Sequence, residues 1–274
     1  MLIADRVALL LLDDRGRRRV PARAAATVLA GALLSELVLR GDLEADPGTG
    51  RLLARPGAAP ERRLAAALAA VTAAAGDAAR SVCALADGPV WDEAVAALGK
   101  AGDLRTERRR RFLVLTTVRW FRREEAVTAL QTQVRTAVSA ARRRGGRTGT
   151  ARAVDPATVS LVVLLAGAGC LRAVAPHLPG GMDPDEAADV LADARTLPPP
   201  AREALEDVES AVAVRVHALT GGDSSGDGTA GGSSSGGDDH HGHHGHHGGS
   251  HGGWDGGSDG GGGGGDGGGG GGGD

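Results

Sequence analysis

The sequence predicts a mainly α-helical fold, in which amphipathic helices pack around one apolar central helix and two short β-hairpins form winged-helix-like edges. Two observations support this prediction. The apolar residues are mostly Ala, Leu and Val, and Ala and Leu have high helix propensity, whereas Phe and Trp are rare and Tyr is absent. Apolar residues also recur at helical spacing between Pro, Gly and Asp residues of the kind that begin or end helices.

The predicted elements follow in chain order. Residues 2–12 form an apolar segment that ends in a turn at 13–16. A helix that begins at Asp155-Pro156 runs through Val174, and it is apolar on every face, which is typical of a core helix. The other predicted helices span residues 22–39, 61–75, 81–86, 90–98, 124–141, 184–195 and 201–219.

Turn residues predict two hairpins between these helices. The first pairs 42–45 with 51–54. The second pairs 104–107 with 112–117 and places Arg108–Arg111 at its tip. A further basic loop is predicted from Arg142 onward.

The charge is divided unevenly, and this division predicts two parts: a folded domain, 1–220, and a disordered Gly/His/Asp-rich tail, 221–274. The tail has no Leu, Ile, Val, Phe, Lys or Arg, and it holds 29 of the 46 glycines, seven of the nine histidines and eight aspartates. Without the tail, 31 basic residues outnumber 26 acidic ones, so the folded part carries a net charge of about +5. A basic body is attracted to phosphate-bearing surfaces.

No motif predicts catalysis or a cofactor, so we expect a protein that is not an enzyme and has no cofactor. The histidines of residues 1–220 are His177 and His217, and neither stands in a motif with a nucleophile or metal ligand. The phosphate-binding pattern GxxxxGK[ST] is absent from the sequence. The N-terminus lacks the features of a signal peptide, and the apolar run 159–171 is too short to span a bilayer. We therefore expect a cytoplasmic protein that is peripheral at the inner face of the membrane.

Clusters of arginine are the informative feature of the folded part, because guanidinium groups bind phosphate with a planar fork of donors. The predicted lipid-binding residues are Arg17, Arg18, Arg19, Arg23, Arg122 and Arg123. The alternative is a solvated surface in an arginine-biased protein, since thirty arginines accompany a single lysine. Nucleic acid is disfavoured as a partner because aromatic residues for base stacking are scarce. The pair Trp120-Phe121 is either an interfacial anchor or part of the core.

The histidines of the tail predict weak and unselective binding of divalent transition metals such as Zn²⁺, Ni²⁺ or Cu²⁺. They stand on a glycine-rich segment that can wrap around an ion but is not preorganised. A low-complexity segment without a role is an equal alternative. The candidate ligands are His240, His241, His243, His244, His246 and His247.

Four segments of this sequence resemble the Golgi phosphoprotein 3 family, including its bacterial members. They are LIADRVALLLLDDRGR, LAGALLSELVLRGDL, GDLRTERRRRFLVLTTVRW and SLVVLLAGAGCLRAV, and the resemblance extends from residue 1 to about residue 217. It implies a mainly helical fold, peripheral binding of phosphatidylinositol 4-phosphate and, in eukaryotes, an adaptor role for Golgi enzymes. It also implies a possible protein client.

The lipid-pocket positions of the family carry other residues here. The pocket tryptophan corresponds to Pro21, the first pocket arginine to Ala30, and two basic positions to Ala129 and Thr132. The expectation is therefore a non-catalytic adaptor that binds phosphatidylinositol 4-phosphate or generic anionic phospholipid head groups through summed charge. The alternative is a cytosolic protein–protein or nucleic-acid-binding module that uses a winged-helix-like edge.

Overall fold

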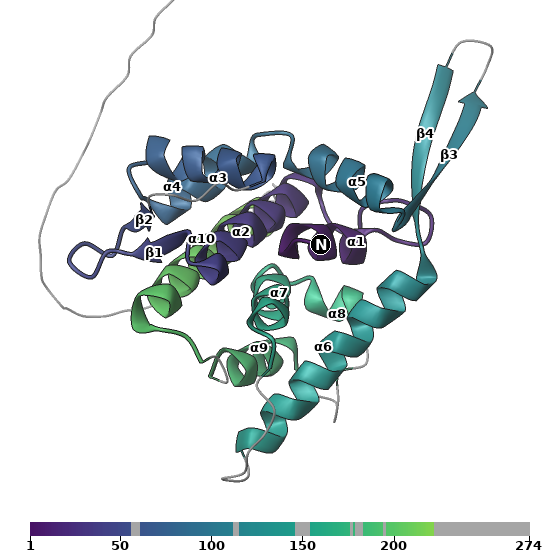
Figure 1. Cartoon of the computed structure of the whole chain (residues 1–274). Coiled ribbons are helices and arrows are strands. Elements are labelled where there is room, and N and C mark those ends of the chain that lie inside the picture. Colours follow the sequence, from purple (N-terminus) through teal and green to yellow (C-terminus); the bar gives the residue numbers. More distant parts are fainter. Residues whose placement is uncertain are drawn as a thin grey trace, which may run out of the picture. The chain divides into compact units, whose positions relative to one another are not determined.

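The computed structural model describes residues 1–55, 61–111, 115–145, 154–175, 178, 183–193 and 196–221. All of them belong to the first of two compact units, Met1–Gly226. The predicted tail lies outside the described residues apart from Gly221. Within the described residues helices predominate and two two-stranded antiparallel sheets accompany them, which confirms the predicted fold class (Figure 1).

The described elements follow one another in the order seen in Figure 1. The helices are α1 (Ile3–Leu11), α2 (Ala22–Arg40), α3 (Arg62–Ala73), α4 (Ala78–Ala86), α5 (Val90–Ala101), α6 (Glu124–Gly145), α7 (Pro156–Gly167), α8 (Leu171–Val174), α9 (Pro184–Asp193) and α10 (Pro199–Thr220). The strands are β1 (Leu43–Ala45), β2 (Leu52–Ala54), β3 (Leu104–Arg111) and β4 (Leu115–Arg122).

Helix α2 lies at the centre of the core and contacts α1, α4, α7 and α10. Ala, Leu and Val occupy almost all of its faces, so nearly every position is buried. Gly31 allows α10 to approach closely, because a Cβ atom at this position would lie 2.4 Å from Cγ2 of Val212. Among the described helices, α2 is long and apolar enough to cross a membrane, but 78% of that stretch is buried. This burial is typical of a core helix.

Helix α7 is the apolar helix that the sequence predicts as the central one. It is buried in the core as expected, but α2 occupies the centre, and α7 is shorter than predicted. Asp155 caps its first turn by accepting a hydrogen bond from the amide of Ala157, and Pro156 occupies the first helical position. The predicted continuation through Val174 is wrong. The helix ends at Gly167, and Gly169 adopts the left-handed conformation with φ +64° before the short helix α8 begins.

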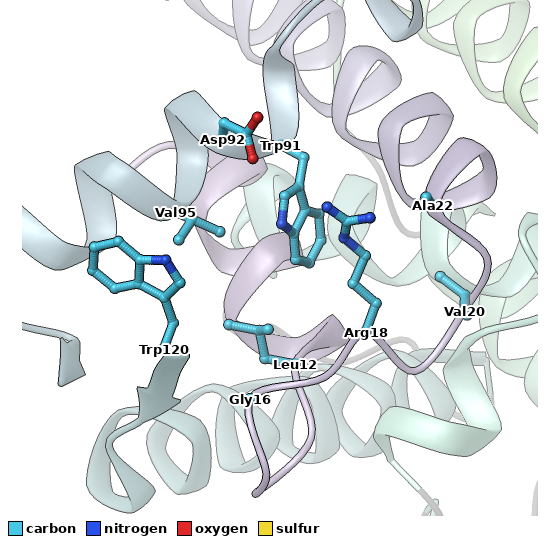
Figure 2. A pocket seen from close by; sticks show the side chains of 9 residues that line it. All are labelled: Leu12, Gly16, Arg18, Val20, Ala22, Trp91, Asp92, Val95 and Trp120. Carbon is cyan, nitrogen blue, oxygen red and sulfur yellow. The ribbon is translucent and has the colours of Figure 1, made fainter. Parts of the chain in front are cut away.

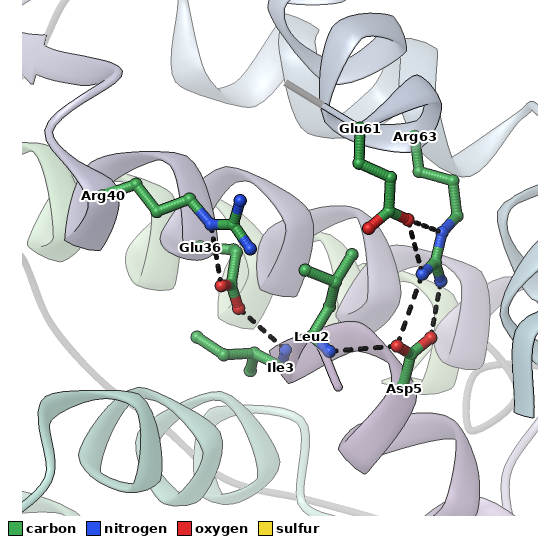
Figure 3. Close-up of polar contacts among 7 residues, drawn as sticks. All are labelled: Leu2, Ile3, Asp5, Glu36, Arg40, Glu61 and Arg63. Atoms are coloured by element: carbon green, nitrogen blue, oxygen red, sulfur yellow. Dashed lines mark hydrogen bonds and ion pairs between the residues drawn. The ribbon is translucent and has the colours of Figure 1, made fainter. Parts of the chain in front are cut away.

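The segment 2–12, predicted only as apolar, contains helix α1, which Leu2 and Leu12 flank. Two carboxylates bind the amides at its start (Figure 3). Asp5 accepts a hydrogen bond from the Leu2 amide at 3.0 Å, and Glu36 accepts one from the Ile3 amide at 2.9 Å. Because the first amides of a helix lack intrahelical partners, these carboxylates fix the start of α1 against α2.

Both predicted hairpins form, but the second has a different register from the predicted one. Strands β1 and β2 pair Leu43 with Ala54. In the second hairpin Leu104 pairs with Arg122 and Arg111 pairs with Leu115. The placement of Arg108–Arg111 at the tip is therefore wrong, since these residues belong to β3. Similarly, α6 extends through Gly145, so the start of the predicted basic loop at Arg142 is helical.

Candidate lipid-docking site

Three segments that are far apart in the sequence meet around a shallow hollow of about 490 Å³ (Figure 2). They are the loop between α1 and α2, the first turns of α5, and the end of β4. The described residues that line the hollow are Leu12, Gly16, Arg18, Val20, Ala22, Trp91, Asp92, Val95 and Trp120. Arg18 and Asp92 are the ionisable side chains in this set, so the hollow combines an apolar wall with one charge of each sign.

The loop between α1 and α2 is shaped by Asp13 and Gly16. The Asp13 carboxylate accepts hydrogen bonds from the amides of Arg15 at 2.8 Å and Arg17 at 2.7 Å. Gly16 has φ +70°, and a Cβ atom there would lie 2.0 Å from the carbonyl oxygen of Trp120. Glycine is therefore required both for the turn and for the close approach of β4.

The surroundings of the Asp13 carboxylate favour its ionised form. Partial burial opposes this by raising its pKa, but the amides of Arg17 and Arg15 and the Arg17 guanidinium together hold the pKa of Asp13 below its usual value. The loop consequently keeps this negative charge among its arginines, and Asp14 adds a second carboxylate, which pairs with Arg122.

Two tryptophans form opposite parts of the hollow (Figure 2). The guanidinium of Arg18 lies 4.7 Å from the ring centre of Trp91, within the range of a cation–π contact. Trp120 packs closely on α5, because a Cβ atom at Gly99 would lie 2.7 Å from its Cζ3 atom. Both tryptophans are half-buried. Trp120 is thus at once a packing residue and a wall of the hollow, and the sequence did not indicate that Trp91 would face it.

Some of the predicted lipid-binding arginines are engaged by neighbouring groups. Arg17 forms an ion pair with Asp13 at 3.4 Å, and Arg122 forms one with Asp14. Arg19 donates hydrogen bonds to the carbonyl oxygens of Leu12 at 3.3 Å and Ala173 at 3.2 Å. The first two arginines are therefore partly neutralised.

Among the described residues, no close carboxylate compensates the charge of the remaining predicted arginines. Arg18, Arg23 and Arg123 are exposed, and within the described residues none of them forms an ion pair. The same holds for Arg19, whose described partners are carbonyl oxygens. Arg18 and Arg19 belong to the loop that lines the hollow, Arg23 begins the next helix, and Arg123 follows β4. The loop contacts the end of β4, since Asp14 pairs with Arg122. The two predicted groups of arginines, 17–23 and 122–123, therefore lie on neighbouring segments of the structure.

The four family pocket positions are distributed differently. Pro21 is exposed between two residues of the hollow, Val20 and Ala22. Ala30 is completely buried in α2 and cannot reach a head group. Ala129 and Thr132 are exposed on α6 and line a separate shallow hollow of about 710 Å³.

No group of three His, Cys, Asp or Glu side chains that could hold a metal ion occurs among the described residues. The six predicted histidine ligands, residues 240–247, lie outside them.

The fold and the hollow together define a helical domain with an arginine-bordered surface site. The sequence profile of the family described as Golgi phosphoprotein 3 (GPP34) matches residues 3–208, about three quarters of the chain. The chain therefore belongs to the Golgi phosphoprotein 3 family. A comparison with curated proteins gives no match.

Proposed function

We propose that this protein is a non-catalytic, cytoplasmic peripheral membrane protein that binds anionic phospholipid head groups, with phosphatidylinositol 4-phosphate as the lipid that family membership favours. The observation that carries the proposal is the convergence of Arg18, Trp91 and Trp120 around one hollow beside further arginines. Tryptophan suits the membrane–water interface because its ring is apolar and its N–H is polar.

An estimate of the electrostatic binding free energy indicates that charge alone is insufficient for stable docking. A basic residue near an anionic leaflet contributes about 1 kcal/mol. The four arginines that have no carboxylate partner among the described residues would contribute about 4 kcal/mol, which corresponds to a dissociation constant of about 1 mM. We therefore infer that the hollow adds contacts to an individual head group and that Arg18, in its lining, makes them.

The lining of the hollow supports a binding role over a catalytic one. A hydrolytic or transfer site requires a nucleophile and a base within hydrogen-bond reach. Among its described lining residues the hollow offers one carboxylate, Asp92, and no histidine, cysteine or serine. A protein client and the adaptor role belong to the same proposal, since a head-group site leaves most of the domain surface available.

Vesicle sedimentation tests the proposal directly. The full chain is mixed with neutral vesicles and with vesicles of graded anionic content, including phosphatidylinositol 4-phosphate, and a duplex DNA competitor is added in parallel. We expect retention that increases with anionic content and is lost at about 0.5 M salt, where screening is strong. The variant Arg18→Gln/Arg23→Gln should lose at least about tenfold in binding, as expected from about 2 kcal/mol.

The matched control is Arg80→Gln/Arg202→Gln, which removes the same charge from exposed positions on α4 and α10 outside the hollow. It should bind nearly as well as the unmodified chain. Equal losses in both variants would show that only net charge matters and would contradict a site at the hollow. Displacement by DNA at equal charge concentration would favour a nucleic-acid module instead.

A further inference from the structure

The hollow beside the loop between α1 and α2 holds one charge of each sign, and the two charges do not pair with each other. Arg18 and Asp92 both line it, and both are exposed. Within the described residues neither side chain forms an ion pair. A purely anionic head group would satisfy Arg18, but it would bring negative charge close to Asp92, where like charges repel. The charge pattern of the hollow therefore favours a ligand that carries both signs.

The start of helix α5 does not by itself account for Asp92. Acidic residues in a first turn complement the helix dipole, and both Asp92 and Glu93 stand in the first turn of α5. Glu93 pairs with Arg62 at 4.0 Å and is not part of the lining, whereas Asp92 belongs to the lining. Because Glu93 already complements the dipole, the position of Asp92 in the hollow is the feature that points to a ligand.

The walls of the hollow beside Asp92 are aromatic and apolar. Figure 2 shows Arg18 on one side of the Trp91 ring and Trp120 on the other. Arg18 lies 4.7 Å from the centre of that ring, so one face of Trp91 already holds a cation. Aromatic faces attract ligand cations in the same way, most strongly when the ring is that of tryptophan. The uncharged side chains of the lining are those of Leu12, Val20, Ala22, Trp91, Val95 and Trp120.

The hydrogen-bonding groups of the lining indicate which type of cation fits. A primary ammonium group has three N–H donors, and each donor withdrawn from water without an acceptor costs free energy. Among its described residues the lining offers one carboxylate, Asp92, and no hydroxyl or amide side chain. A quaternary ammonium group has no N–H donor, so it can contact aromatic faces and a single carboxylate without this cost. The lining therefore favours a quaternary over a primary ammonium group.

We propose that the hollow binds a phosphocholine head group. Arg18 binds the phosphate through its planar fork of donors, and Trp91, Trp120 and Asp92 hold the quaternary ammonium group. The volume of about 490 Å³ lies within the range of small-molecule sites, about 300–1,000 Å³. This assignment rests on the proposed docking to membranes, in which the arginines outside the lining attract the anionic lipids around the bound head group.

Titration of the full chain with soluble head groups tests the site without a membrane. Trp254→Phe removes the tryptophan of the tail, so that the fluorescence reports on Trp91 and Trp120. Phosphocholine should cause a saturable change and bind at least about tenfold more tightly than phosphoethanolamine, whose ammonium group is primary. Inorganic phosphate and choline chloride, titrated separately, should each bind more weakly than phosphocholine, because each engages only one of the two charges.

The two neighbouring acidic residues of α5 provide a matched pair of variants. Asp92→Asn should weaken phosphocholine binding at least about tenfold and leave the binding of inorganic phosphate no weaker. Glu93→Gln removes the same charge one position away, outside the lining, and should bind phosphocholine as the unmodified chain does. Arg18→Gln should weaken the binding of both phosphocholine and inorganic phosphate. An unchanged circular dichroism spectrum shows that each variant is folded.

Vesicles separate this assignment from the proposed membrane docking. At fixed anionic content, replacing phosphatidylcholine by a neutral glycolipid should lower the retention of the unmodified chain but not that of Asp92→Asn. If phosphocholine causes no saturable change, or if Asp92→Asn and Glu93→Gln bind it equally well, the assignment is wrong, although retention on anionic vesicles would still support membrane docking. If phosphocholine binds but no vesicle retains the chain, membrane docking is wrong, and with it the assignment to a lipid head group.

Discussion

Arg63 and Asp5 are 58 positions apart in the sequence, yet the guanidinium of Arg63 donates two hydrogen bonds, of 2.5 and 3.3 Å, to the Asp5 carboxylate (Figure 3). The side chains are 12% and 7% exposed, respectively. Arg63 also forms an ion pair with Glu61, and Asp5 accepts the amide of Leu2. This network joins the start of α1 to α3 on one side of the central helix α2.

Arg63→Gln should lower the free energy of unfolding by about 3 kcal/mol, because it leaves the Asp5 carboxylate buried without a counter-ion. Urea unfolding followed by circular dichroism measures the change. The neighbouring Arg62 is 93% exposed in its ion pair with Glu93, so Arg62→Gln should change the stability by less than about 0.5 kcal/mol. Similar values for the two variants would contradict an energetic role for the buried pair.

Gly16→Ala and Gly41→Ala should differ, although both glycines have positive φ values of 70° and 76°. At Gly41 a Cβ atom would meet nothing within 4 Å, so the substitution should cost about 1 kcal/mol from backbone strain alone. At Gly16 the Cβ atom would collide with the Trp120 carbonyl oxygen. We expect a larger loss, of about 3 kcal/mol, together with weaker vesicle binding, because the loop must move away from β4.

Thermal unfolding and vesicle sedimentation of the two alanine variants provide the measurements. If Gly16→Ala is no more destabilising than Gly41→Ala, then the loop does not depend on its close contact with β4. If vesicle binding is unchanged while stability falls, the conformation of the loop is not part of the lipid site.

Local signals in the sequence were sufficient to predict most of the helices. Asp155-Pro156 begins α7, and Gly41 ends α2 in the left-handed conformation with its amide bonded to the carbonyl of Val38. Capping depends on residues within one turn of the helix end, so it can be inferred without tertiary information. The existence of the two hairpins could be predicted for the same reason, because their turn residues are also a local signal.

Long-range relationships could not be predicted in this way. The contact between Arg18 and Trp91 depends on how α5 packs beside the loop between α1 and α2, and no short motif records it. The register of the second hairpin was predicted incorrectly because four consecutive arginines resemble a solvated tip, whereas pairing with β4 keeps them in the strand. Gly169 was assigned to a helix because its neighbours are apolar.

The tail should bind transition metals without any effect on the folded domain. The untagged chain is expected to be retained on immobilised Ni²⁺ and to lose retention when the six histidines from His240 to His247 are changed to Gln. Zn²⁺ should leave the unfolding temperature of the domain unchanged, since the described residues offer no group of metal ligands. A rise in unfolding temperature with Zn²⁺ that survives the histidine changes would indicate a metal site elsewhere in the chain.

The two cysteines should differ in their reactivity with iodoacetamide. Burial raises the pKa of Cys170 to about 11, and its thiol donates a hydrogen bond to the carbonyl oxygen of Ala168. At pH 8 about one thousandth of this thiol is ionised, and the thiolate is the reactive form. Cys83 is half-buried, lines a surface hollow and contacts the guanidinium of Arg215.

Mass spectrometry of the native chain at pH 8 should therefore find the label on Cys83 and almost none on Cys170. Cys83→Ser should abolish rapid labelling, and unfolding in urea should make Cys170 reactive because the desolvation that raises its pKa is lost. Equal labelling of both cysteines in the folded chain would mean that α7 and α8 open readily around Cys170, contrary to its position in the core.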